Sequence, residues 1–116
     1  MVVDELTDAE IDSIFQALAD ATRRDIVRRV MVDDLSVSGL ARDYAMSFAA
    51  VQKHVAVLER AALVVKQRHG REQRVHGSAA RLHQAARLLD AYAELWAGRA
   101  DSIAELLASD TKGQRS

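Results

Sequence analysis

The sequence predicts a mainly α-helical fold with one small β-hairpin, and three observations support this fold class. Apolar residues recur at helical spacing through most of the chain, which contains no proline. Two of the predicted helices are short and are separated only by Ala45 and Met46, so they must cross steeply, as in a helix-turn-helix. A run of alternating residues follows directly and predicts a two-stranded hairpin, which makes the fold a winged helix-turn-helix.

Composition limits the architecture further. The chain has 116 residues, of which 49% are hydrophobic, and this size predicts a single domain over residues 1–110 with a disordered tail over 111–116. Because there is no cysteine, disulfide and thiolate chemistry are excluded, as in many proteins of the reducing cytosol. No signal-peptide pattern begins the sequence, and no segment approaches the roughly 20 apolar residues of a membrane span. We therefore expect a cytoplasmic protein with no membrane partner.

The starts of the first three helices follow from their capping residues. Thr7 and Glu10 form a capping box before the first helix. Asp20 can cap the second helix, and Ser36 or Val37 begins the third.

The fourth helix, predicted over residues 47–60, has the pattern of a recognition helix. Val51, Val55 and Leu58 face the core, so the opposite face is exposed. Recognition helices present their N-terminal residues to base edges, where glutamine can pair with adenine and lysine can donate to guanine or phosphate. The candidate DNA contacts on this helix are Ser47, Phe48, Ala49, Gln52, Lys53 and His54.

Two of these candidates have a second interpretation. Phe48 either contacts a thymine methyl group or folds back onto the turn between the helices. His54 stands at the margin between the two helix faces, where it either contacts a phosphate or packs as a half-buried residue.

The hairpin that follows, over residues 64–76, is predicted to be a wing. Gly70 supplies the positive φ of a tight turn, and Arg68, Arg71 and Arg74 lie near the tip, within reach of a minor groove or flanking phosphates. Between residues 42 and 76, seven basic residues oppose three acidic ones, a net charge of +4 in a chain whose total is −1. The positive charge is therefore concentrated where a phosphate backbone could bind.

Two arginines stand at an unfavourable place in the second helix. Arg23 and Arg24 occupy its first turn, where the helix dipole disfavours positive charge. They predict a role other than stabilising their own helix, either an ion pair with a carboxylate of another helix or a contact with a backbone phosphate.

A long C-terminal helix is predicted over residues 79–109. Its apolar residues recur at alternating spacings of three and four, which suits packing against another helix, and a second copy of the chain is the simplest partner. The candidate interface residues are Leu82, Leu89, Ala93, Trp96, Ile103 and Leu107. Gly98 predicts either a slight break in the helix or close packing.

Four blocks of sequence carry a resemblance to a known family. They are residues 15–27 (FQALADATRRDIV), 35–41 (LSVSGLA), 46–55 (MSFAAVQKHV) and 57–59 (VLE). In their order and spacing they resemble the ArsR-type winged helix-turn-helix repressors of bacteria. Residues 96–106 resemble the members that end in one long dimerisation helix. The resemblance implies a homodimer that binds DNA and represses its own or a neighbouring operon.

The chain departs from this family at two helix ends. Ala21 stands where proline is usual. Ala62, which helical periodicity places toward the core, stands where glycine is usual. Neither position is expected to contact DNA.

The positions of the family's metal ligands hold other residues here. Ser36 and Ser38 replace the third-helix cysteines of metal-sensing members, and Tyr92, Ile103 and Leu106 replace histidine and acidic ligands of the last helix. The four histidines lack HxH or HxxxH spacing. We therefore expect no metal and no cofactor within one protomer, while a site shared across a dimer remains an open alternative.

The sequence thus predicts a homodimeric transcriptional repressor of a partly palindromic, double-stranded DNA operator. It contains no Gly-rich phosphate loop, nucleophile motif or cofactor fingerprint, so no enzyme activity is expected. One alternative is a winged-helix module that binds proteins and not DNA, which the net charge of −1 permits. Another is a repressor released by an organic or atypical inducer, which the sequence does not identify.

Overall fold

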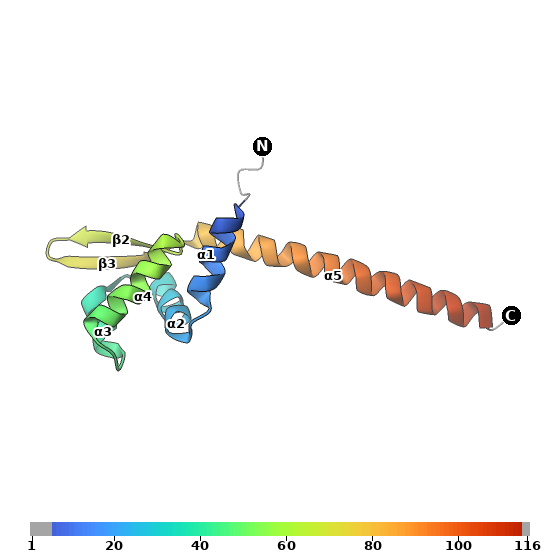
Figure 1. Ribbon diagram of the computed structural model, residues 1–116, viewed down its shortest axis with the longest axis horizontal. Coiled ribbons are helices and arrows are strands. Elements are labelled where there is room, and N and C mark those ends of the chain that lie inside the picture. The colour runs from blue at the N-terminus through green and yellow to red at the C-terminus, as the bar shows by residue number, and fades with distance from the viewer. Residues whose placement is uncertain (1–5, 115–116) are drawn as a thin grey trace. The chain divides into compact units, whose positions relative to one another are not determined.

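The structure, a computed structural model, describes residues 6–114, which form five helices and three short strands (Figure 1). In chain order the elements are α1 (Asp8–Leu18), α2 (Ala21–Val32), β1 (Leu35–Ser36), α3 (Val37–Asp43), α4 (Phe48–Arg60), β2 (Val64–His69), β3 (Glu72–Gly77) and α5 (Ala79–Gln114). One compact unit extends to Ala85, and the remainder of α5, from Ala86, forms a second unit. No helix in the described residues is long and apolar enough to cross a membrane.

The predicted fold class is confirmed, and local capping explains where its helices begin. The Thr7 hydroxyl accepts from the Glu10 N–H at 3.1 Å, while the Glu10 carboxylate accepts from the Thr7 N–H at 3.0 Å. Asp20, Ser36 and Ser47 cap α2, α3 and α4 through bonds of 3.0, 3.0 and 3.1 Å. Each cap satisfies an N–H that has no partner inside its helix.

The end of α4 differs from the prediction at one residue. The Leu63 N–H donates to the Leu58 carbonyl at 3.0 Å and the Ala62 N–H donates to the Glu59 carbonyl at 2.9 Å, which together form a Schellman cap. This cap gives Ala62 a left-handed backbone, with φ of 59°, and leaves its side chain exposed. The prediction that Ala62 faces the core is therefore wrong, and Leu63 enters the core instead.

The sheet has three strands, one more than the predicted hairpin. In that hairpin His69 pairs with Glu72 across a two-residue turn, where Gly70 has φ of 61°. β1 pairs with the other side of β3, giving the strand order β1-β3-β2. Two residues carry no measurable periodicity, so the sequence pattern could not predict β1. Its pairing joins the base of the wing to the start of α3.

The core lies between the helices and the inner face of the sheet. Its largest fully buried side chains are Ile14, Ile26, Leu40, Leu58, Leu63, Val51, Val55, Val64 and Val75. Ala85 is buried and Leu82 packs against the same core, so the start of α5 belongs to this unit. Gly77 permits a close approach, because a Cβ at this position would lie 2.5 Å from the Met31 sulfur.

The C-terminal helix is longer than predicted. The expected helix ends at residue 109 and is followed by a tail over 111–116, whereas α5 continues to Gln114, and residues 115–116 lie outside the described part. No proline stops the helix in this segment. α5 also passes through Gly98 without a break. The expectation of a single domain over residues 1–110 stays a prediction.

Candidate nucleic-acid interface

Helices α3 and α4 form a helix-turn-helix in which α4 has one buried and one exposed face. Val51, Val55 and Leu58 are buried, as predicted. The structure brings the exposed side chains of Phe48, Ala49, Gln52 and Lys53 together on the opposite face, over the first turns of the helix. Phe48 is 47% exposed, so its ring does not fold into the core. This surface offers an amide, a cation, a methyl group and an aromatic ring to a ligand.

The other two candidates on α4 are engaged within the protein. The Ser47 hydroxyl serves as the N-cap of the helix. His54 is half-buried, and its Nδ1 lies 3.3 Å from a guanidinium nitrogen of Arg23 and 4.0 Å from a carboxylate oxygen of Asp20. A guanidinium can only donate, so in a hydrogen bond between Arg23 and His54 the Nδ1 would be the acceptor.

Arg23 and Arg24 bind the C-terminal end of the preceding helix. Arg23 donates to the carbonyls of Ala17 at 2.7 Å and Gln16 at 2.9 Å, and Arg24 donates to the carbonyl of Leu18 at 2.7 Å. These carbonyls carry the partial negative charge at the end of α1. In the described residues these guanidinium groups bind carbonyls and not the expected carboxylate, while the expected phosphate contact stays a prediction. The sequence pattern did not predict this contact, because it joins side chains of α2 to backbone carbonyls at the end of α1.

The register of the wing separates its arginines. Arg68 lies opposite Gln73 and Arg74 lies opposite Gln67, so the two side chains project from opposite faces of the hairpin. The Arg68 Nε donates to the Gly70 carbonyl at 3.2 Å, and Arg74 lies 3.6 Å from the Glu72 carboxylate. Arg71 occupies the turn itself and is exposed. The three cations therefore surround the wing tip and do not share one face.

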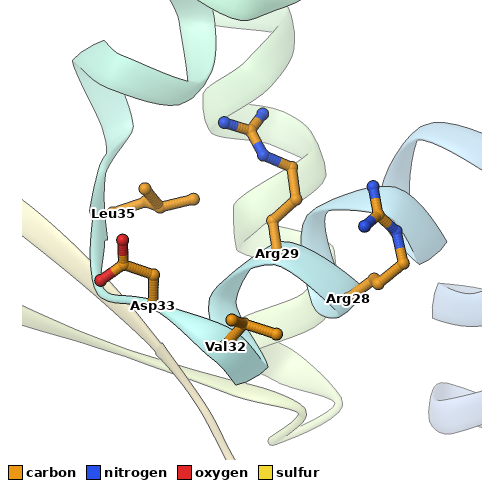
Figure 2. Close-up of a pocket in the computed structure, with 5 residues that line it drawn as sticks. All are labelled: Arg28, Arg29, Val32, Asp33 and Leu35. Carbon is orange, nitrogen blue, oxygen red and sulfur yellow. The ribbon is translucent and has the colours of Figure 1, made fainter.

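A small open pocket of about 280 Å³ lies beside the C-terminal turn of α2 (Figure 2). It is lined by Arg28, Arg29, Val32, Asp33 and Leu35. Both of its guanidinium groups are already paired, one at 2.6 Å from Asp25 and the other at 2.5 Å from Asp43. With Asp33 in the wall, the pocket offers no surplus of positive charge for an anion.

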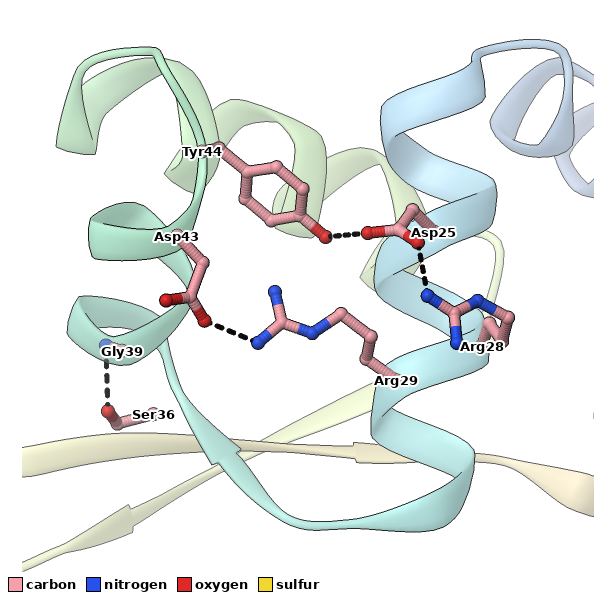
Figure 3. A network of polar contacts seen from close by, with 7 residues as sticks. All are labelled: Asp25, Arg28, Arg29, Ser36, Gly39, Asp43 and Tyr44. Atoms are coloured by element: carbon pink, nitrogen blue, oxygen red, sulfur yellow. Dashed lines mark hydrogen bonds and ion pairs between the residues drawn. The ribbon is translucent and has the colours of Figure 1, made fainter.

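The same ion pairs belong to a polar network that joins α2 to α3 (Figure 3). The Tyr44 hydroxyl donates to the Asp25 carboxylate at 2.5 Å, and the Arg29 guanidinium lies 5.5 Å from the centre of the Tyr44 ring. The Tyr44 hydrogen bond, together with Arg28, lowers the pKa of Asp25, whereas burial and the Asp25 carboxylate raise the pKa of Tyr44. The network fixes the first helix of the helix-turn-helix against α2.

The histidines of the sheet form no recognisable metal centre. The His76 Nδ1 lies 2.7 Å from Asp34, and the rings of His76 and His69 are 6.4 Å apart. Within the described residues, no group of three or more histidine, cysteine, aspartate or glutamate side chains is placed to hold a metal ion.

The predicted helix-packing residues are mostly uncovered. Leu82 packs against the core of its own protomer, whereas Leu89, Ala93, Trp96, Ile103 and Leu107 are exposed. Further large apolar side chains are exposed on the same helix, and their positions are Tyr92, Leu95 and Leu106. An exposed apolar stripe of this length is typical of surfaces that pack against another protein chain.

Comparison with known proteins places this geometry in a family, although no protein-family model matches the sequence. Over 53 residues the chain is 51% identical to the HTH-type transcriptional regulator Rv2034 of Mycobacterium tuberculosis, a match that covers 46% of this chain and half the length of that relative. An ArsR-like transcriptional regulator from Rhodococcus sp. RHA1 has a similar structure, with a TM-score of 0.79 and 35% identity over 87% of this chain and 93% of that one.

A more distant structure shares the fold. It is the homodimeric winged helix-turn-helix DNA-binding domain of Mb0332 from Mycobacterium bovis, with a TM-score of 0.61 and 18% identity over 78% of this chain and 89% of that one. The Rhodococcus protein is related in sequence along nearly its whole length and therefore supports the assignment to a family more strongly. This chain belongs to the ArsR family of winged helix-turn-helix transcriptional regulators, a family of regulators and not of enzymes.

Proposed function

We propose that the protein is a homodimeric repressor that binds a specific, partly palindromic DNA operator. The observation that carries this proposal is the exposed face of Phe48, Ala49, Gln52 and Lys53 at the start of α4, followed directly by a basic wing. Helices that read DNA present such N-terminal residues to the major groove, and a wing beside them can reach neighbouring phosphates or the minor groove. Homodimerisation would place one α4 in each of two successive major grooves.

Each contact has a proposed role. Gln52, Lys53, Ala49 and Phe48 contact base edges, with Phe48 placed against a thymine methyl group. Arg71, Arg68 and Arg74 supply charge at the periphery. Ser47 positions α4 as its cap, and the half-buried His54 contacts a backbone phosphate.

The proposal includes a regulatory mode that does not depend on thiolate metal sensing. No cysteine is present, and serines stand at the positions of the third-helix thiolates. We therefore propose that any inducer is organic or of an atypical kind.

Anisotropy titrations across a salt series test the proposal. The labelled duplex would carry the DNA upstream of the protein's own gene, and a scrambled duplex of equal length would be the control. We expect tighter binding to the upstream duplex. The binding constant should also fall as salt rises, with a slope of roughly −0.9 per phosphate contact in a plot of its logarithm against the logarithm of the salt concentration. Equal, weak and salt-independent binding to both duplexes would favour the protein-binding alternative, for which the exposed stripe of α5 is the supporting surface.

A further inference from the structure

His54 is the residue through which α4 contacts the corner between α1 and α2. It directly follows Lys53, one of the exposed side chains proposed to read DNA, but its own side chain is only 21% exposed. Its Nδ1 lies 3.3 Å from a guanidinium nitrogen of Arg23 and 4.0 Å from a carboxylate oxygen of Asp20. Asp20 is the N-cap of α2 and Arg23 lies in the first turn of that helix. Polar groups therefore join α4 to the start of α2.

The guanidinium of Arg23 is held from its other side by α1. Its Nε donates to the Ala17 carbonyl at 2.7 Å, and one terminal nitrogen donates to the Gln16 carbonyl at 2.9 Å. The remaining terminal nitrogen is the one that lies beside His54. Because a guanidinium is planar and rigid, two bonds to carbonyls fix the direction of its third nitrogen. The end of α1 therefore determines where Arg23 meets α4.

This contact restrains a motion of α4 that its apolar packing allows. Val51 and Val55 are buried, but apolar burial is non-directional and permits a small rotation of a helix about its axis. A hydrogen bond has a preferred length and angle. His54 stands between the buried and exposed faces, so a directional contact there sets the directions of Gln52 and Lys53 as well. A recognition site needs its side chains within about 0.5 Å and 10 to 20° of the productive geometry.

We infer that Arg23 is a positioning residue for DNA recognition, which holds the His54 ring and through this ring fixes the rotation of α4 in the major groove. The inference rests on the proposed function and deepens it, because it names a residue that determines sequence discrimination without contacting a base. Arg23 acts from within the protein, whereas Gln52 and Lys53 act on the DNA.

Arg24 provides a matched control for Arg23. It is the next residue of α2, carries the same charge, and donates to the Leu18 carbonyl at the same end of α1, at 2.7 Å. Among the described residues, the guanidinium hydrogen bond of Arg24 runs to α1 and that of Arg23 reaches α4 as well. Arg23→Gln and Arg24→Gln therefore each remove one charge and bonding to α1, but only Arg23→Gln removes the contact with α4.

Competition titrations of the full chain on the upstream and scrambled duplexes compare the two variants. Arg23→Gln should lower the ratio of specific to scrambled binding by about 2- to 12-fold, the range that corresponds to one hydrogen bond. Arg24→Gln should keep the ratio of the wild type. Equal ratios in the two variants would overturn the inference. A salt slope that is smaller by about 0.9 in Arg23→Gln alone would also overturn it, because Arg23 would then bind a phosphate itself.

A double-mutant cycle tests whether Arg23 acts through His54. His54→Phe keeps an aromatic ring at this position and removes both ring nitrogens. On this background Arg23→Gln should cause no further loss of discrimination, because the contact is already absent. Losses that add would show that Arg23 acts by another route, and the inference would be wrong.

Nitrogen NMR of the histidine rings tests the contact in the absence of DNA. The Nδ1 resonance of His54 should shift in Arg23→Gln and stay in place in Arg24→Gln, and an unshifted resonance in both would contradict the contact. Should Arg23→Gln fail to fold, Arg23→Lys replaces it. Lysine keeps the charge but cannot bond two carbonyls and His54 together, so the same loss of discrimination is expected.

The wild-type protein separates failure of the inference from failure of the proposed function. If the wild type binds the two duplexes equally, the proposed function fails and the inference fails with it. If the wild type discriminates between them and Arg23→Gln discriminates equally well, only the inference fails.

Discussion

At the scale of single residues, Ala62 has a backbone conformation that is unusual for an alanine. The Schellman cap of α4 requires a left-handed conformation here, which is about 1 kcal/mol less favourable for alanine than for glycine. Glycine loses somewhat more entropy on folding. We expect Ala62→Gly to raise the free energy of unfolding by about 0.5 kcal/mol in urea denaturation. Ala61→Gly, in the adjacent right-handed C-cap position, is the control and should be destabilising.

Ala21 offers the complementary change at the start of a helix. It is the first residue of α2, where an N–H has no partner in the helix, and Asp20 before it has φ of −116° and ψ of 132°, a conformation that a following proline allows. Ala21→Pro should therefore raise the melting temperature, by a stabilisation of about 0.4 to 1 kcal/mol. Ala19→Pro would lose the N–H that donates to the Gln16 carbonyl at 3.2 Å, so this variant should have a lower melting temperature.

The proposed DNA contacts divide into residues that read bases and residues that bind phosphate. Gln52→Ala should relax discrimination at one or two base pairs, by about 1 to 3 kcal/mol. Arg71→Ala should weaken specific and scrambled duplexes by similar factors and lower the salt slope by about one unit. Competition titrations of both variants across a salt series provide the measurement. If the two variants exchanged these effects, the roles assigned to α4 and the wing would be reversed.

At the scale of elements, the polar network between α2 and α3 should make the stability of the fold depend on pH. Its hydrogen bond from Tyr44 lowers the pKa of Asp25, so the ionised carboxylate stabilises the fold above its unfolded pKa of about 3.9. This contribution is lost as pH falls through the lower, folded pKa. Tyr44 has a raised pKa, so its contribution is present below about pH 10 and is lost as pH rises further.

The substitution Tyr44→Phe isolates this hydrogen bond. We expect it to destabilise the protein by about 1 kcal/mol at pH 7, a modest value because the Asp25 side chain is 36% exposed. The difference between wild type and variant in urea midpoints should shrink from pH 5 to pH 2. A difference that stays constant across this range would mean that the hydroxyl acts on stability through something other than the Asp25 carboxylate.

Some features of these elements could be predicted from the sequence, and others could not. Helix starts were predictable because caps such as Thr7 with Glu10 act over three residues of the chain. The end of α4 was not, because periodicity assigned Ala62 to the core while the Schellman cap turned it outward. β1 and the arginine contacts at the end of α1 depend on segments that meet only in the folded chain. The exposed face of α4 followed from periodicity alone, whereas the roles of its residues on DNA remain predictions.

At the scale of the whole molecule, the proposed homodimer depends on burying Trp96. Trp96→Asp would place a charge in an apolar seam and should weaken dimerisation by several kcal/mol, with a parallel loss of DNA affinity. Sedimentation velocity and anisotropy measure the two effects. Trp96→Leu keeps the position apolar and should retain the dimer. If Trp96→Asp sediments as wild type does, the protein assembles through another surface.

The place of β2 at the outer edge of the sheet has a consequence for solubility. In the described part of the chain β2 pairs on one side only, with β3, and Val65 is 50% exposed on it. Such an edge is a template on which a strand of another molecule can add, leading to aggregation. Arg68 puts positive charge along this edge, and two wings carrying it repel one another. The cations that would hold DNA would thus also keep the wings apart, so variants that remove them should be checked for precipitation before a loss of binding is attributed to DNA.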